Sequence, residues 1–155
     1  MFWMHSRTAW NDYFTGNPTL FQKTLYEERQ TPSETNVYVS NCLFRSISTT
    51  STGGALNCSN SVTYLLVESS SFFSCKARDR GGAIYFYNRN SGQSVYYEVC
   101  SYDCCSTGDL YGQFSYNQLY DVTSTKNYIY FSSIVRCGTE ISNPHHSICH
   151  HYGTH

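Results

Sequence analysis

Cysteine is the most reactive residue type that recurs at regular positions in this chain. Cys75, Cys104 and Cys137 each close a five-residue motif in which small, large and small residues alternate. If these motifs are neighbouring strands, the three thiols lie one above another about 5 Å apart, which is within disulfide range. Two interpretations fit: buried thiols that act as small apolar fillers, or at least one cross-link.

Histidine is concentrated at the carboxyl end, where five of the six residues lie together with Cys149. Imidazole and thiolate are good ligands for zinc, copper or nickel, but the spacing here fits no defined zinc finger. A structural metal site, an adventitious affinity for metal and an unstructured tail are the three interpretations. We expect a flexible tail over 141–155, and we assign no metal, cofactor or catalytic residue.

The acidic residues test whether the chain has the carboxylates of a polysaccharide-cleaving enzyme. Such enzymes need several acids on adjacent strands, to hold Ca²⁺ or to act as acid and base. Glu68 and Glu98 come closest, but they are 30 residues apart, one more than the repeat described below, so their side chains should point to opposite faces. We therefore expect no enzyme, and a polysaccharide lyase or glycoside hydrolase is the alternative.

Aromatic and basic residues supply a second candidate for binding. Tyr85, Phe86 and Tyr87 follow a pair of glycines, and the chain has 15 tyrosines in all, so one interpretation is a platform on an exposed sheet on which sugars stack. The alternative is that about half of these aromatic residues fill the core from alternate strands. Arg78 and Arg80, with Lys76, form a small basic segment before Gly81 that reads as a solvated turn.

A repeated motif indicates which elements must position these side chains. It begins at Cys42, Ser71, Cys100 and Ser133, at spacings of 29, 29 and 33 residues. Side chains on a strand alternate between two faces, so one face of each copy is predicted to be internal. Its twelve members are Cys42, Phe44, Ser46, Ser71, Phe73, Cys75, Cys100, Tyr102, Cys104, Ser133, Val135 and Cys137. We expect Phe44, Phe73 and Tyr102 to stack in one column, because each copy would be one rung of a coil.

A Gly-Gly-Ala step follows the first two copies, at Gly53-Gly54-Ala55 and Gly81-Gly82-Ala83. Glycine adopts positive φ without strain, so this step predicts a sharp corner before the next apolar residue enters the core. The third copy has a degraded form of the step at 107–111.

Together these patterns predict an all-β fold, a right-handed parallel β-helix of about four to five rungs with a short helical cap. The cap is residues 1–36, with a helix that starts after Asn17-Pro18 and runs to Arg29. We expect this helix to cover one end of the coil. The β-helix is residues 37–140, and the tail is 141–155.

The overall charge and hydropathy exclude several classes of partner. Lys and Arg total 10 and Asp and Glu total 11, so the basic footprint of a nucleic-acid-binding protein is missing. No apolar run approaches the roughly 18 residues needed to span a bilayer, and the amino end does not fit a secretion signal. The oligomeric state does not follow from the sequence.

The strand motif with Phe44 or Phe73, followed by Gly53-Gly54-Ala55-Leu56 or Gly81-Gly82-Ala83-Ile84, resembles the repeats of polymorphic outer membrane proteins. Those proteins are known from chlamydiae and are similar to surface families of trichomonad-like protists. The chlamydial motif has Asn three residues after Phe, whereas this chain has Ile47 and Lys76, so the cysteine-bearing protist variety is the closer match. The resemblance covers about residues 37–137.

What the resemblance implies is a protein at the cell surface or outside the cell, used in adhesion. We therefore expect a non-catalytic scaffold that presents an extended face to a host-cell protein or a glycan. A truncated fragment of a longer surface protein, with no independent function, is the other alternative.

Overall fold

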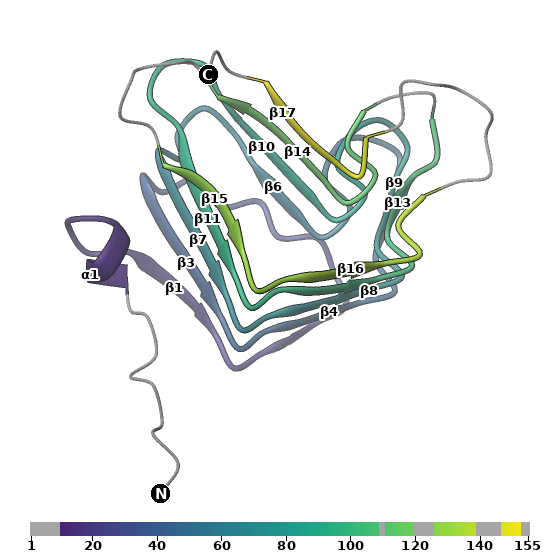
Figure 1. Cartoon of the computed structure of the whole chain (residues 1–155), viewed down its shortest axis with the longest axis horizontal. Helices are drawn as coiled ribbons and strands as arrows, with labels where there is room; N and C mark the ends of the chain where they lie inside the picture. The colour runs from purple at the N-terminus through teal and green to yellow at the C-terminus, as the bar shows by residue number, and fades with distance from the viewer. Residues whose placement is uncertain (1–9, 109–110, 120–125, 139–146, 153–155) are drawn as a thin grey trace, which may run out of the picture.

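The chain forms an all-β parallel solenoid of about three turns. The computed structural model describes residues 10–108, 111–119, 126–138 and 147–152. A complete coil passes through four parallel sheets, which we call A, B, D and C in the order in which the chain visits them. Figure 1 shows successive coils lying one over another, so that equivalent strands are neighbours. The predicted parallel solenoid is therefore confirmed.

Sheets A and B each contain five strands and form two adjoining sides of the coil (Figure 1). The strands of sheet A, in spatial order, are β1 (Thr19–Gln22), β3 (Asn36–Ser40), β7 (Tyr64–Glu68), β11 (Gln93–Tyr97) and β15 (Asn127–Tyr130). Those of sheet B are β2 (Leu25–Tyr26), β4 (Leu43–Arg45), β8 (Ser71–Phe73), β12 (Cys100–Tyr102) and β16 (Ser133–Val135).

Sheets D and C complete each coil. Sheet D has three short strands, β5 (Ser48–Thr49), β9 (Lys76–Ala77) and β13 (Cys105–Ser106). Sheet C has four, β6 (Leu56–Cys58), β10 (Ile84–Asn88), β14 (Ser115–Leu119) and β17 (Cys149–Tyr152). The carboxyl-terminal strand β17 pairs with β14 in parallel, so Cys149–Tyr152 extends sheet C and is not part of a flexible tail.

The helix predicted between Asn17 and Arg29 is wrong, because this segment forms strands β1 and β2. Thr19 lies opposite Val37 in sheet A, and Leu25 lies opposite Leu43 in sheet B. A short isolated helix is marginal in water, whereas a strand here gains hydrogen bonds from the coil that follows it. Parallel pairing thus begins at Thr19, before the residue 37 at which the sequence pattern started the coil.

A different helix, α1 (Trp10–Tyr13), lies outside sheet A (Figure 1). Trp10 and Phe14 are buried against a column of outward side chains from Tyr38, Leu66 and Val95. Helix α1 and Phe14 therefore cover a lateral face of the solenoid and not one of its ends.

Two ladders of non-glycine residues with positive φ mark the corners on either side of sheet B. Between sheets A and B they are Lys23, Asn41, Ser69, Glu98 and Phe131, with φ between 44° and 53°. Between sheets B and D they are Ser46, Ser74, Asp103 and Arg136, with φ between 51° and 56°. A left-handed residue turns the chain sharply, so the alternation of faces in a strand does not continue through the corner.

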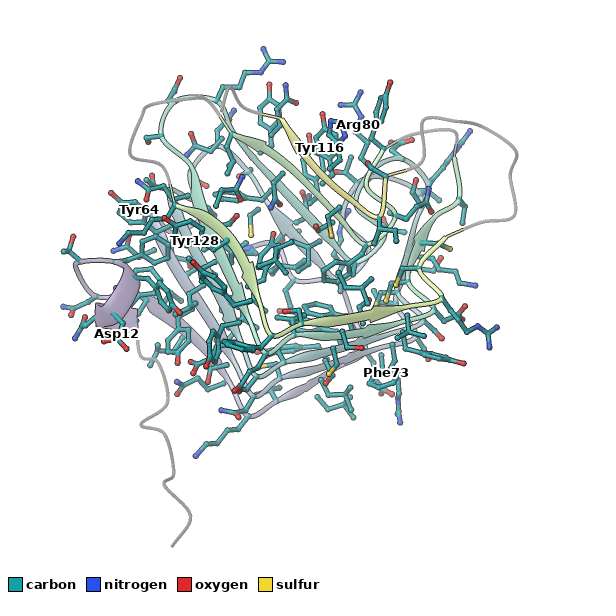
Figure 2. All side chains as sticks on the ribbon, in the orientation of Figure 1. Asp12, Tyr64, Phe73, Arg80, Tyr116 and Tyr128 are labelled. Carbon is teal, nitrogen blue, oxygen red and sulfur yellow. The ribbon has the colours of Figure 1, made fainter. Side chains whose placement is uncertain are left out.

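These corners explain why the predicted inner face is only partly correct. Of the twelve side chains expected inside, five are buried: Cys42, Phe44, Cys75, Cys104 and Cys137. Phe44 pairs with Phe72, 28 residues later, and their rings stack 4.7 Å apart between centroids. Phe73 is 40% exposed and Tyr102 is 39% exposed, so the predicted Phe44–Phe73–Tyr102 column does not form. Figure 2 shows Phe73 pointing away from the interior.

The third corner is built from glycine, as the Gly-Gly-Ala step predicted. Gly53 and Gly81 have φ of 64° and 65°, and a Cβ on either would lie within 2.5 Å of a backbone oxygen. The third member of this ladder is Gly112, with φ of 76°, and not the predicted Gly108. The register places it there, because Ser115 lies opposite Ile84.

Candidate binding face on the outside of sheet C

The residues after the second glycine corner alternate as a strand should. Ile84, Phe86 and Asn88 of β10 are buried, while Tyr85 and Tyr87 are half-buried on the outer face of sheet C. Of the three aromatic residues singled out in the sequence, Phe86 is thus a core residue and the two tyrosines face outward.

A column of rings runs across sheet C on this outer face. Tyr85 pairs with Tyr116, and Tyr116 pairs with His150 of the carboxyl-terminal strand. The Tyr85 and Tyr116 rings are 5.5 Å apart and 7° from parallel, and the Tyr116 and His150 rings are 5.1 Å apart at the same angle. Parallel strands repeat about every 4.8 Å, so in-register aromatic side chains stack naturally along the axis.

Two arginines flank this column. The Arg80 guanidinium lies 5.0 Å from the centre of the Tyr116 ring and donates a 3.4 Å hydrogen bond to its hydroxyl oxygen. The Arg89 guanidinium lies 5.1 Å from the centre of the Tyr87 ring. Figure 2 shows Arg80 and Tyr116 together on the outside of the coil. We call this surface the tyrosine–arginine face; its members are Arg80, Tyr85, Tyr87, Arg89, Tyr116 and His150.

The glycine corners make room for the tyrosines. A Cβ on Gly112 would lie 2.8 Å from the Cβ of Tyr116, and a Cβ on Gly53 would lie 3.0 Å from the Cβ of Tyr85. A larger residue at either corner would therefore push against the column. The glycine corners thus allow the backbone to turn and also leave space for the tyrosine side chains beside them.

The face carries positive charge at its edges, from Arg80 and Arg89. Burial, and then the neighbouring Tyr116, raises the pKa of Tyr85, so this phenol keeps its proton at neutral pH. Burial, and then the positive charge of Arg80, lowers the pKa of His150, so the imidazole is neutral there. The four strands of sheet C contain no Asp or Glu. An anionic group can therefore approach without meeting a carboxylate from these strands.

Stacking also changes what the tyrosines can do. Both faces of the Tyr116 ring are occupied, one by Tyr85 and the other by His150. A sugar needs a free ring face on which to stack, and Tyr116 offers none. It is only 4% exposed, and its hydroxyl accepts from Arg80 and donates to Gln118. The aromatic population was visible in the sequence, but the orientation of the rings was not.

The acidic pair considered in the sequence does not meet. Glu68 lies opposite Tyr97, so Glu98 is one residue out of register with it, as predicted. Glu68 is buried and accepts a hydrogen bond from the Tyr38 hydroxyl, whereas Glu98 accepts one from the Ser69 hydroxyl at 2.9 Å. The two carboxylates are therefore engaged separately.

The cysteine column is formed as predicted. Cys75, Cys104 and Cys137 are all buried and occupy equivalent positions in successive coils. All eight cysteines of the chain are free thiols in the structure.

The histidine cluster is only partly described. Cys149 and His150 lie in β17, while His145, His146 and His155 fall outside the described residues. Within the described ranges, no group of three His, Cys, Asp or Glu side chains is arranged to hold a metal ion. The structure instead gives His150 a place in the ring column.

Comparison of the chain with protein-family profiles, curated proteins and solved structures finds no match. The resemblance to polymorphic outer membrane proteins therefore rests on the motifs alone. In the part of the chain that the structure describes, no helix has the length and apolar character needed to cross a bilayer.

Proposed function

We propose that the chain is a non-catalytic β-solenoid module of a surface or adhesion protein, and that its tyrosine–arginine face binds an acidic glycan. A solenoid stacks its coils into long lateral sheets, which suits it to present an extended surface. The motif resemblance adds the surface location. The observation that carries the proposal is the ring column of Tyr85, Tyr116 and His150 with arginines beside it.

The chemistry of the face favours a glycan over a protein. On the described part of sheet C, the outward side chains are the phenols of Tyr85, Tyr87 and Tyr116, the imidazole of His150 and the amides of Asn57 and Gln118, and none of these is aliphatic. A protein interface usually centres on a buried apolar anchor, which this face does not offer. Guanidinium groups and phenol hydroxyls instead match carboxylate or sulfate groups on a polymer rich in hydroxyls.

The test is retention of the folded chain on immobilised polygalacturonate and heparin, with dextran as the neutral polymer. We expect retention on the two acidic polymers that weakens as salt is added. Changing Arg80→Gln and Arg89→Gln together should weaken it by about tenfold or more, because charge-assisted hydrogen bonds are lost. The control is Arg45→Gln, because Arg45 belongs to β4 of sheet B, away from this face, and its guanidinium pairs with Glu27 at 2.5 Å.

Three outcomes would contradict the proposal. Equal retention of the double variant and the unchanged chain would mean that another surface binds. Retention on an acidic protein but on neither acidic polysaccharide would identify a protein partner instead. Release of unsaturated or reducing ends from polygalacturonate would make the module an enzyme.

A further inference from the structure

Three thiols inside the coil serve no purpose in the binding proposed above. Cys75, Cys104 and Cys137 each follow a left-handed corner residue that turns the next side chain inward. Lys76 lies opposite Cys105, and Tyr102 lies opposite Val135, so Cys104 is in register with both of the other cysteines. The Cα atoms of such neighbours are about 4.8 Å apart, inside the range of 4.4 to about 6.8 Å found for disulfides.

Direct contacts place Cys104 at the centre of the column. The Cys75 backbone N–H donates to the Cys104 sulfur at 3.4 Å. The Cys104 thiol donates to the Tyr102 carbonyl oxygen at 3.6 Å, and its pKa responds to the thiols of both Cys75 and Cys137. The Ser101 hydroxyl lies 3.2 Å from the Cys137 sulfur. No other pair of cysteines in the chain shares this arrangement: Cys58, for example, lies opposite Phe86 in sheet C.

The three thiols differ in acidity. The hydrogen bond with Cys104 lowers the pKa of Cys75 even though burial opposes this. For Cys104, the hydrogen bond with Cys137 lowers the pKa, but the one with Cys75 and burial together raise it to about 12. The hydrogen bond with Cys104, and then burial, raises the pKa of Cys137. Cys75 is thus the most acidic of the three thiols.

We propose that this column is a thiol–disulfide relay that holds one disulfide, always through Cys104, and that it is loaded from Cys137. Of the three cysteines, Cys137 lies nearest the carboxyl-terminal end of the stack and is 7% exposed, whereas Cys75 and Cys104 are fully buried. A small disulfide from solution therefore meets Cys137 first. Exchange requires the attacking, central and leaving sulfurs to lie roughly in line, which a column of three equivalent thiols provides.

The exchange balances in three steps. The Cys137 thiol first loses its proton, which its raised pKa makes the slow step, and the thiolate attacks a small disulfide, RSSR, whose S–S bond breaks and releases one RSH. The Cys104 thiolate then attacks the Cys137 sulfur, releases the second RSH and forms the Cys104–Cys137 bond. Cys75 can attack Cys104 in turn, and Cys137 then leaves as a thiol. The first two steps oxidise two thiols and reduce one RSSR, and the third has no net redox change.

The test starts from fully reduced, folded chain incubated with oxidised glutathione as the small disulfide. Acid quenching, alkylation and mass spectrometry of unreduced peptides then locate every linkage. In the unchanged chain we expect Cys104 linked to Cys137 or to Cys75. Absence of both linkages, while exposed Cys100 carries glutathione, would overturn the proposal without any variant.

Single substitutions test the order of the relay, with circular dichroism to check that each variant is folded. Cys104→Ser should abolish the internal cross-link and trap Cys137 as its glutathione adduct, and a Cys75–Cys137 bond would contradict the relay.

Cys75→Ser should leave the Cys104–Cys137 bond in place. Cys137→Ser should slow formation of the Cys75–Cys104 bond by about tenfold or more, equivalent to ~1.4 kcal/mol of barrier. Equal rates in these last two variants would refute entry at Cys137. Cys58→Ser is the matched buried control and should change nothing.

Discussion

Single residues with positive φ shape this molecule, and glycine is required only where a side chain has no room. The corner at Ser74 tolerates a serine with φ of 51°, and its hydroxyl donates to Asp103 of the next coil at 3.1 Å. At Gly81 a Cβ would lie 2.1 Å from the carbonyl oxygen of Ile84. The two corners therefore differ in the space around them and not only in backbone conformation.

Gly81→Ala tests this difference. We expect it to lower the free energy of unfolding by about 3 kcal/mol, since it adds both strain at positive φ and a clash with backbone. Gly138→Ala is the control, because nothing lies within 4 Å of the position of a Cβ there. Its effect should stay within about 0.5 kcal/mol. Urea unfolding followed by circular dichroism measures both, and similar values for the two variants would refute the argument.

His150 gives the ring column a dependence on pH. Burial, and then Arg80, lowers the imidazole pKa in the folded chain, so between the two pKa values the unfolded chain binds more protons. Stability is therefore fully present above the unfolded value of about 6.5 and falls as the pH drops through it. We expect unfolding free energy to decrease from about pH 7.5 to about pH 5.5, and to decrease less in His150→Gln. An identical pH dependence of the two chains would contradict this assignment.

At the scale of the strand, register decides which aromatic residues form the core. Phe72 is buried, stacked on Phe44 at an angle of 3° and in contact with the edge of Phe114. Its neighbour Phe73 faces outward beside Tyr102, with ring centroids 6.2 Å apart. These two adjacent phenylalanines thus differ in burial because they lie on opposite faces of β8.

Phe72→Ala and Phe73→Ala make a matched pair that measures the register. We expect Phe72→Ala to lower the unfolding free energy by about 3–5 kcal/mol, as for other buried phenylalanines. Phe73→Ala should cost about 1 kcal/mol or less, since the side chain is partly exposed. Chemical denaturation gives both numbers. The reverse ranking would restore the register expected from the sequence spacing.

The same two residues show why the sequence predicted the coil but not its register. Similar motifs recur at nearly constant spacing because equivalent positions of successive coils stack. This spacing was enough to predict the parallel solenoid. The motif Ser71-Phe72-Phe73 fits either a 28-residue or a 29-residue step, and nothing in the local pattern distinguishes them. The left-handed corners then break the alternation that the sequence argument extended from strand to strand.

The strands at the amino end and the ring column on sheet C could not be predicted from local sequence, because contacts between residues distant in sequence determine them. The apolar residues at Leu20, Phe21 and Leu25 fit a helix about as well as a strand, and only pairing with β3 and β4 selects the strand. The tyrosines of the binding face were identifiable by type. Their stacking, and the inclusion of His150, required the partner strands and could not be read from spacing.

At the scale of the whole molecule, residues 10–14 cover the outer face of sheet A. Trp10 is 4% exposed and lies 6.2 Å from Tyr38 between ring centroids, while Phe14 stacks on Tyr64 at 4.9 Å. Beneath them, Leu66 and Val95 would otherwise be apolar residues on an outer face. Trp10 and Phe14 thus shield these apolar side chains from solvent.

Trp10→Ala should loosen this cover. We expect a loss of about 3 kcal/mol in unfolding free energy and increased binding of a dye specific for exposed apolar surface. The comparison is Leu20→Ala, which removes an apolar residue of the same outer column that is already 55% exposed. If both variants behave alike, the segment does not shield sheet A.

The backbone hydrogen bonds between coils all run along the solenoid axis. A load applied along that axis therefore falls on one interface between neighbouring coils at a time, so the molecule should peel open coil by coil at low force. A load applied along the strands would have to shear a whole row of bonds together. A module of this kind resists tension best when its attachment points pull across the stack.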